Sequence, residues 1–344
     1  MSTSSDLLQT TGGIKLCPEL ILKVAEELIA TDPEAINSLL RTSASLYSLL
    51  KTYEKSICAS VLKRDSRLAW VNVDQHEVLS SQLPLGSSSV TKYTYPWVVE
   101  MRSRVNTVEF LVQYDLTDMI DHHAQNWPTL DVPKAKLCQL VMLFKRLSFS
   151  LLFKLADCTA GLKETLKIRA KQAEFLESLT TAELASLGVI VEVMGQNYFT
   201  MTKNALDKSV SADDRPLSPA PLEWFFAPNT VDLVDVPNDN WIRECMCVFE
   251  DLIQRFGPHF PYIFLKEGKD RLLDPQPWAR HMLQDGLDNM NAFELGYTMS
   301  FASLQSVVWN VFCRKEKCTP ADRWVMAKEV VENEMQAYEI DDEA

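Results

Sequence analysis

Glycine is scarce in this sequence. The 344 residues include only 10 glycines, well below the roughly 7% of an average protein. Because sandwiches, barrels and propellers need many tight turns, the scarcity argues against these architectures and favours helices joined by short loops. At this length, two domains are the starting expectation.

Long uncharged apolar runs are also missing. The most apolar stretch, residues 137–156, carries Lys145 and Arg146 at its centre, where a bilayer makes charge costly. The first thirteen residues have neither the basic nor the apolar region of a secretory signal. The eight cysteines form no dense framework, which is typical of reduced thiols. These features predict a soluble cytoplasmic or nuclear protein with no membrane partner.

An excess of basic residues is absent as well. The chain has 34 Lys and Arg against 47 Asp and Glu, a net charge of -13, which repels phosphate backbones and argues against nucleic-acid binding. It contains no phosphate-binding Gly-rich loop, no HExxH and no GxSxG elbow. The sequence therefore predicts a protein that is not an enzyme and uses no cofactor.

Apolar residues at helical spacing run along most of the chain. Pro33 predicts the start of a second helix, with Asp32 as its cap, and Thr42-Ser43 can cap a third. Thr180 and Glu183 form a capping box that opens a long helix. Besides the first helix at 19–28, helices are expected near 54–64, 104–124, 134–156, 160–178, 240–257, 276–285, 291–313 and 320–338. The predicted fold class is all-α.

Prolines divide the helical pattern. Residues 207–239 hold five of the chain's 16 prolines, and each removes a backbone donor, so this stretch is predicted to be a linker or lid. The expected organisation is a disordered segment at 1–15, a small module at 16–62, helical domains at 65–206 and 240–338, and an acidic tail at 339–344.

Two groups of residues invite a metal-site interpretation. Asp115, Asp118 and His122 share one face of a helix and provide metal ligands or a general base; a solvated acidic face is the ordinary alternative. The cysteines form two close pairs, 245/247 and 313/318. Alternate helical positions diverge by about 200°, so packing is the preferred interpretation of the first pair, and we predict no metal site.

Residues 16–50 carry the one pattern that points to a function. The apolar and capping residues follow a fixed order: Leu16, Pro18, Glu19, Leu20, Ile21, Leu22, Val24, Ala25, Leu28, Asp32, Ile36, Leu39, Arg41, Thr42, Leu46, Tyr47, Leu49 and Leu50. This order resembles the fungal form of the F-box. The sequence departs from that form at Cys17, where proline is common, and at 43–45, where basic residues are usual.

The resemblance implies a specific role. F-box proteins dock a Skp-type adaptor of a cullin–RING ubiquitin ligase and present a bound protein substrate to it. The implied adaptor-binding residues are the apolar set of the module: Leu16, Pro18, Leu20, Ile21, Val24, Leu28, Ile36 and Leu39. Of these, Pro18 and Ile21 lie near the expected helix start, where we expect few core contacts.

Three alternatives stay open at this point. The module is either an F-box or an ordinary N-terminal helical subdomain packed on the body. The chain is either a ligase subunit or a helical enzyme, small-molecule or metal-dependent, that uses Asp118 and His122. A third possibility is an F-box protein that acts outside ubiquitination.

Overall fold

The computed structural model describes residues 16–65, 67, 78–80, 89–113, 127, 129–130, 132–211, 240–265, 276–294 and 304–341. Most of these residues are helical, with a two-stranded hairpin as the exception among them, which confirms the predicted all-α class. The chain divides into two compact units: unit 1 comprises residues 1–81 and 86–106, and unit 2 comprises 82–85 and 107–344. The segments at 1–15 and 212–239 lie outside the described residues.

Unit 1 begins with four short helices. Its elements are α1 (Pro18–Thr31), α2 (Ala35–Leu40), α3 (Ala44–Thr52), α4 (Glu54–Arg64), β1 (Val78–Ser80), β2 (Ser89–Thr91) and the first part of α5 (Tyr95–Gln113). The predicted cap of α3 is confirmed, because the Ser43 hydroxyl accepts from the Leu46 N–H at 3.2 Å. Helix α2 begins two residues after Pro33, and the Asp32 carboxylate instead accepts from the Ala35 N–H at 3.3 Å.

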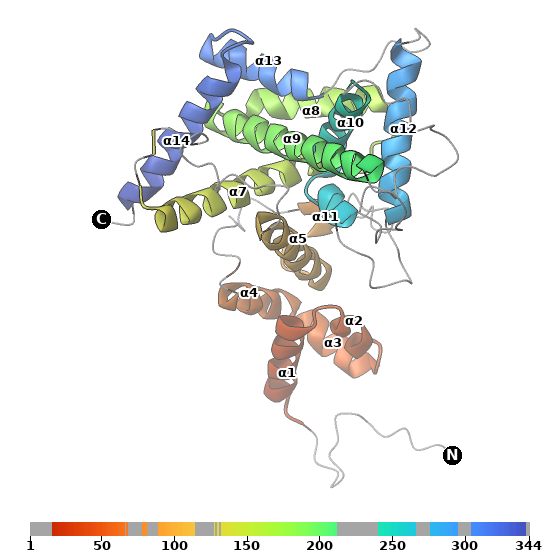
Figure 1. Cartoon of the computed structure of the whole chain (residues 1–344). Helices are drawn as coiled ribbons and strands as arrows, with labels where there is room; N and C mark the ends of the chain where they lie inside the picture. Colours follow the sequence, from red (N-terminus) through yellow and green to blue (C-terminus); the bar gives the residue numbers. More distant parts are fainter. Residues whose placement is uncertain are drawn as a thin grey trace. The chain divides into compact units, whose positions relative to one another are not determined.

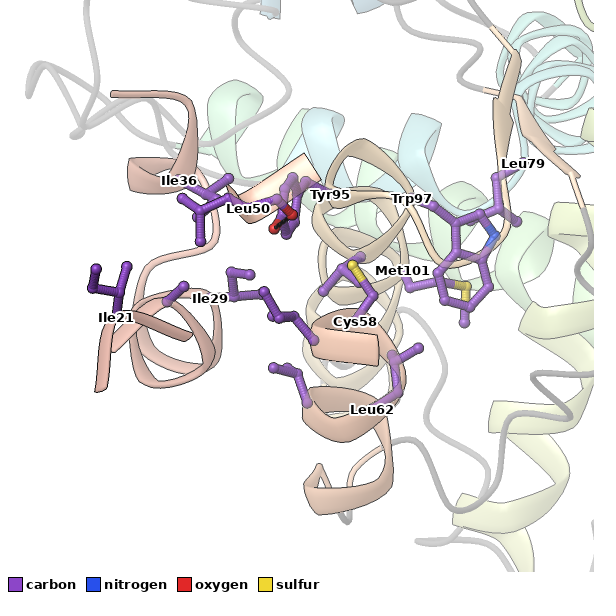
Figure 2. Packing of buried hydrophobic residues seen from close by; sticks show 14 of the residues in the cluster. Ile21, Ile29, Ile36, Leu50, Cys58, Leu62, Leu79, Tyr95, Trp97 and Met101 are labelled. Carbon is purple, nitrogen blue, oxygen red and sulfur yellow. Dashed lines mark hydrogen bonds between the residues drawn. The ribbon is translucent and has the colours of Figure 1, made fainter. Parts of the chain in front are cut away.

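The core of unit 1 extends beyond the predicted module. Figure 2 shows side chains from α1 to α4 meeting Trp97 and Met101 of α5 and Leu79 of β1. A module of about 45 residues buries too small a share of its surface to be stable alone. The residues of α5 supply the missing apolar surface, and their helix starts nine residues before the predicted 104.

A buried carboxylate fixes the start of α5. Glu54 is the first residue of α4 and is 9% exposed. Its carboxylate accepts from the Tyr95 N–H and from the Lys51 ammonium, each at 2.9 Å. The first N–H groups of a helix have no partner within it, so Glu54 acts as a distant cap for α5. The Tyr95 hydroxyl adds a hydrogen bond to the Leu50 carbonyl at 2.7 Å.

Unit 2 is built around a 31-residue helix, α9 (Thr181–Ser211). Figure 1 shows α9 running through the middle of this unit, and α7, α10, α13 and α14 pack against it. The other helices of the unit are α7 (Lys134–Asp157), α8 (Thr165–Ser178), α10 (Asn240–Phe256), α11 (His259–Leu265), α12 (Gln276–Glu294), α13 (Leu304–Glu316) and α14 (Arg323–Asp341).

Several predicted boundaries of unit 2 hold and others are wrong. Helix α9 continues to Ser211, into the linker predicted at 207–239, and α14 continues to Asp341, into the tail predicted at 339–344. The capping box is confirmed, since Glu183 accepts from the Thr180 N–H at 2.8 Å and Thr180 accepts from the Glu183 N–H at 3.2 Å. Gly257 ends α10 with a φ of 68°, as glycine readily does. The predicted break at 286–290 is wrong, because α12 continues through it. The glycine there, Gly286, lies against Val248 of α10.

An unpaired carboxyl group lies inside unit 2. Glu250 of α10 is fully buried, and neither carboxyl oxygen has a hydrogen-bond partner among the described residues. Its side chain fills the space that a side chain on Gly195 of α9 would occupy. Burial, and then the charge of Glu192, raise the pKa of Glu250 to about 9, with Asp251 adding to the rise and Arg323 opposing it. The group is therefore neutral near pH 7.

We expect Glu54→Ala to lower the free energy of unfolding of unit 1 by about 1–3 kcal/mol, because it leaves the Tyr95 N–H buried and unpaired. Hydrogen exchange of the amides in 95–106 measures the change. Glu54→Gln keeps an acceptor and should cost less. Glu27→Ala removes a carboxylate of an exposed ion pair and should leave exchange unchanged. Equal protection in Glu54→Ala and Glu27→Ala would show that the cap does not stabilise the unit.

We expect Glu250→Gln to become more stable relative to the wild type as pH rises. A carboxyl whose pKa is raised on folding holds its proton in the folded state between pH 4.5 and about 9, so wild-type stability falls over this range by up to about 1.4 kcal/mol per pH unit. Glutamine cannot ionise and escapes this loss. The measurement is the exchange protection of α9 and α10 amides, variant against wild type at each pH from 5 to 9.

The matched control for this pH series is Glu334→Gln, a change at an exposed carboxylate of α14. Its protection relative to the wild type should not vary with pH. If the exchange protection of Glu250→Gln relative to the wild type is also constant with pH, Glu250 is ionised in the folded protein or its burial does not affect stability.

Candidate docking face of helix α1

The ends of α1 are well defined. Cys17 precedes the helix in an extended conformation, and its carbonyl accepts from the Leu20 and Ile21 N–H groups at 3.1 and 3.3 Å. Pro18 suits the first helical position because it has no N–H to leave unpaired. At the other end, the Arg102 guanidinium from α5 donates to the Ile29 carbonyl. The helix is therefore anchored to the core of unit 1 near its last turn.

Helix α1 is apolar over more of its circumference than the core covers. Ile21, Ala25 and Ile29 are 7%, 0% and 1% exposed and face the core. Leu20 and Val24 lie about 60–100° around the helix from Ile21, and they are 53% and 59% exposed. One side of the apolar arc thus stabilises unit 1, and the adjoining side is uncovered in this chain.

The structure separates the eight predicted adaptor-binding residues into three groups. Four are exposed on α1 or just before it: Leu16, Pro18, Leu20 and Val24. Two are half-buried and pack against the core: Leu28 and Leu39. Two are buried in the core: Ile21 and Ile36. We call the four exposed residues the α1 docking face.

The expectation that Ile21 makes few core contacts is wrong. Although Ile21 lies in the first turn of α1, it belongs to the buried cluster of unit 1 with an exposure of only 7%. Helical periodicity explains this burial, since Ile21 is one turn from Ala25 and two from Ile29. Ile21 and Ile36 therefore hold the docking face in place without being accessible themselves.

Charged side chains border the docking face. Lys23 pairs with Glu26 at 2.8 Å, and Glu27 pairs with Arg64 of α4 at 2.7 Å. The hydrogen bond and charge of Arg64 lower the pKa of Glu27, which keeps its carboxylate ionised. Lys23 and Glu27 lie three positions from Leu20 and Val24 respectively, so they are their neighbours on the helix surface. An apolar strip with a charged rim is the usual composition of a protein interface.

Two exposed aromatic residues were not predicted as docking residues. Tyr47 of α3 is 51% exposed, and Tyr53, which follows α3, is 45% exposed. Tyr47 was noted within the motif, but not among the docking residues. The sequence carries a signal for the exposure of Tyr47. Leu46 and Leu50 are one turn apart and share one face of α3, so Tyr47 lies on another face. The structure buries both leucines.

The other candidate sites have less support in the structure. Asp115, Asp118 and His122 lie outside the described residues, so the enzyme alternative stays a hypothesis. In the part of the chain that the structure describes, no three His, Cys, Asp or Glu residues are grouped to hold a metal ion. Cys245 is buried in α10, and its burial is the main cause that raises the pKa of its thiol to about 12. The Cys245 side chain therefore packs in the core.

None of the described helices is both long and apolar enough to cross a membrane.

No protein-family model, curated protein or solved structure matches this chain. The functional argument therefore depends on the residues of unit 1 and on their exposure.

We expect Ile21→Ala to lower the free energy of unfolding of unit 1 by about 2–4 kcal/mol, because it opens a cavity under α1. Val24→Ala shortens an exposed side chain and should change stability by less than about 0.5 kcal/mol. Hydrogen exchange of amides in α1 and α4 measures both. Similar losses for the two variants would show that Val24 is covered within the chain and that the docking face is not free.

Proposed function

We propose that this protein is the substrate-receptor subunit of an SCF-type cullin–RING ubiquitin ligase. Its F-box, residues 16–50, docks a Skp-type adaptor through the α1 docking face. The observation that carries the proposal is the exposure of Leu20 and Val24 at 53% and 59% within a sequence pattern that resembles the F-box.

The burial pattern supports this proposal over an ordinary packed subdomain. An N-terminal helix that only completes a core would direct its apolar residues inward, whereas α1 presents Leu20 and Val24 one turn apart on its open side, and Leu16 is exposed just before the helix. Single exposed apolar residues are common on protein surfaces, but exposed apolar residues one turn apart on one helix match an anchor set for a partner.

The rigidity of unit 1 supports the same role. Ile36, Leu46 and Leu50 are each at most 1% exposed, so α2 and α3 are fixed behind α1. A docking face that is already ordered loses little conformational entropy when a partner binds. The fixed geometry suits a constant partner, as the adaptor is for an F-box.

Unit 2 would then bind the protein substrate. It has a separate core around α9, with Phe249 of α10 stacked on Tyr198 at a centroid distance of 4.3 Å. We assign it no chemistry of its own, because an F-box subunit works by bringing a substrate to the ligase. The proposed partners are the adaptor, the cullin–RING ligase and a protein substrate.

The test is the affinity of the purified full chain for a Skp-type adaptor, measured by calorimetry. We expect Leu20→Asp and Val24→Asp each to weaken binding by about tenfold or more, since a charge in place of a buried anchor costs roughly 1.4 kcal/mol or more. Helical content and the midpoint of thermal unfolding should stay close to those of the wild type, because both side chains are exposed.

Matched controls come from unit 2. Leu166 and Val325 are 70% and 68% exposed, so Leu166→Asp and Val325→Asp introduce the same charge on an apolar surface site outside the F-box. Both should bind the adaptor as the wild type does. A wild-type chain that binds no Skp-type adaptor at micromolar concentration would overturn the proposal. Adaptor binding without recovery of the cullin from the native cell would favour an F-box protein that acts outside ubiquitination.

A further inference from the structure

The turn after α13 brings two cysteines together. Helix α13 ends at Glu316, and Lys317 follows with a φ of 56°, in the left-handed region. The Cys318 N–H then donates to the Cys313 carbonyl at 3.1 Å. This bond across five residues belongs to the pattern that closes many helix C-termini. It ties together the backbones of the two residues that carry thiols.

The Cys313 side chain points toward the segment that carries Cys318. Its thiol lies 3.8 Å from the Thr319 carbonyl, next to Cys318 in sequence. Both cysteines are partly exposed. Burial first, and then Cys318, raise the pKa of the Cys313 thiol. The turn thus holds two neighbouring thiols that a small solute can reach.

We propose that Cys313 and Cys318 form a redox-sensitive dithiol that a small-molecule disulfide, such as oxidised glutathione, converts to an intramolecular disulfide. The site is separate from the α1 docking face and does not depend on the proposed ligase role. A disulfide needs its α-carbons roughly 4.4–6.8 Å apart, and a backbone hydrogen bond between the same two residues holds them near that separation.

The reaction balances without a further oxidant. The thiolate of one cysteine attacks one sulfur of the small disulfide, forms a mixed disulfide and releases one small thiol. The thiolate of the other cysteine then attacks the sulfur of the first, which closes the protein disulfide and releases the second small thiol. In sum, two protein thiols are oxidised and one small disulfide is reduced to two thiols.

The thiolate is the nucleophile in both steps. Burial first, and then Cys318, raise the pKa of the Cys313 thiol, so its share of the reaction is slow near neutral pH. Charged neighbours act in opposite directions on the pKa of Cys313, since Asp322 raises it and Arg323 lowers it.

The disulfide would fix the connection between α13 and α14. Thr319 and Asp322 form a hydrogen bond of 2.5 Å in this connection, and the Arg323 guanidinium lies over the Trp309 ring at 5.4 Å. Both helices pack against α9. Oxidation would thus close the turn at the end of α13, within the connection that leads to α14.

The experiment treats the folded full chain with oxidised glutathione at pH 7.5, quenches it with acid, blocks free thiols and maps the peptides by mass spectrometry. We expect the peptide that contains both cysteines to lose two hydrogen atoms, at least tenfold faster than Cys138 or Cys247 is modified. These two are the controls, because each is also only partly buried. Raising the pH to 9 should accelerate closure, since more Cys313 is then ionised.

Two single variants test the closing step. Cys313→Ser and Cys318→Ser should each accumulate one glutathione on the remaining cysteine, because no second thiol displaces it. A disulfide that forms only after the chain is unfolded in urea would overturn the proposal. So would a wild-type peptide that keeps both thiols, or that carries two glutathiones instead of an internal bond.

Discussion

The structure of unit 1 depends on how α5 meets the first four helices. The Glu54 carboxylate receives the Tyr95 N–H at 2.9 Å, so the same residue begins α4 and caps α5. Once α5 is placed, Trp97 and Met101 close the core that the short helices leave open. Because a buried acceptor without a donor is costly, the cap and the core stabilise each other. The segment at 16–62 is therefore one part of a larger folded unit.

This constraint also determines what α1 can offer a partner. The core takes up Ile21, Ala25 and Ile29, each no more than 7% exposed, and these three occupy one side of the apolar arc. A single helix packed on one core cannot bury an arc much wider than one face. Leu20 and Val24 are left outside, and their exposure follows from the same packing that orders the helix. In the proposed function, the adaptor covers what the core cannot.

Sequence patterns predicted local features better than long-range ones. The helix class, the cap at Ser43 and the box at Thr180 depend on residues within one turn, so they could be predicted from spacing alone. The early start of α5 depends on Glu54, a partner 41 residues away, and the hairpin pairs Ser80 with Ser89 and Val78 with Thr91. Both depend on contacts beyond one helical turn, and no signal within a turn reports them. The docking set was predicted only as a group, because periodicity cannot say which side of a broad arc faces the core. That division came from the burial of Ile21 against the exposure of Leu20.

The docking face depends on α5 for its fixed geometry. A fragment that ended at residue 62 would lose Tyr95, Trp97 and Met101, leaving the Glu54 carboxylate without its backbone donor and Cys58 without its cover. Helices this short are marginal in water unless tertiary packing stabilises them, so α1 would lose its fixed orientation along with its core. The Arg102 bond to the Ile29 carbonyl would go at the same time. In the proposed function, adaptor binding would therefore depend on the whole of unit 1, because α5 holds α1 in its orientation.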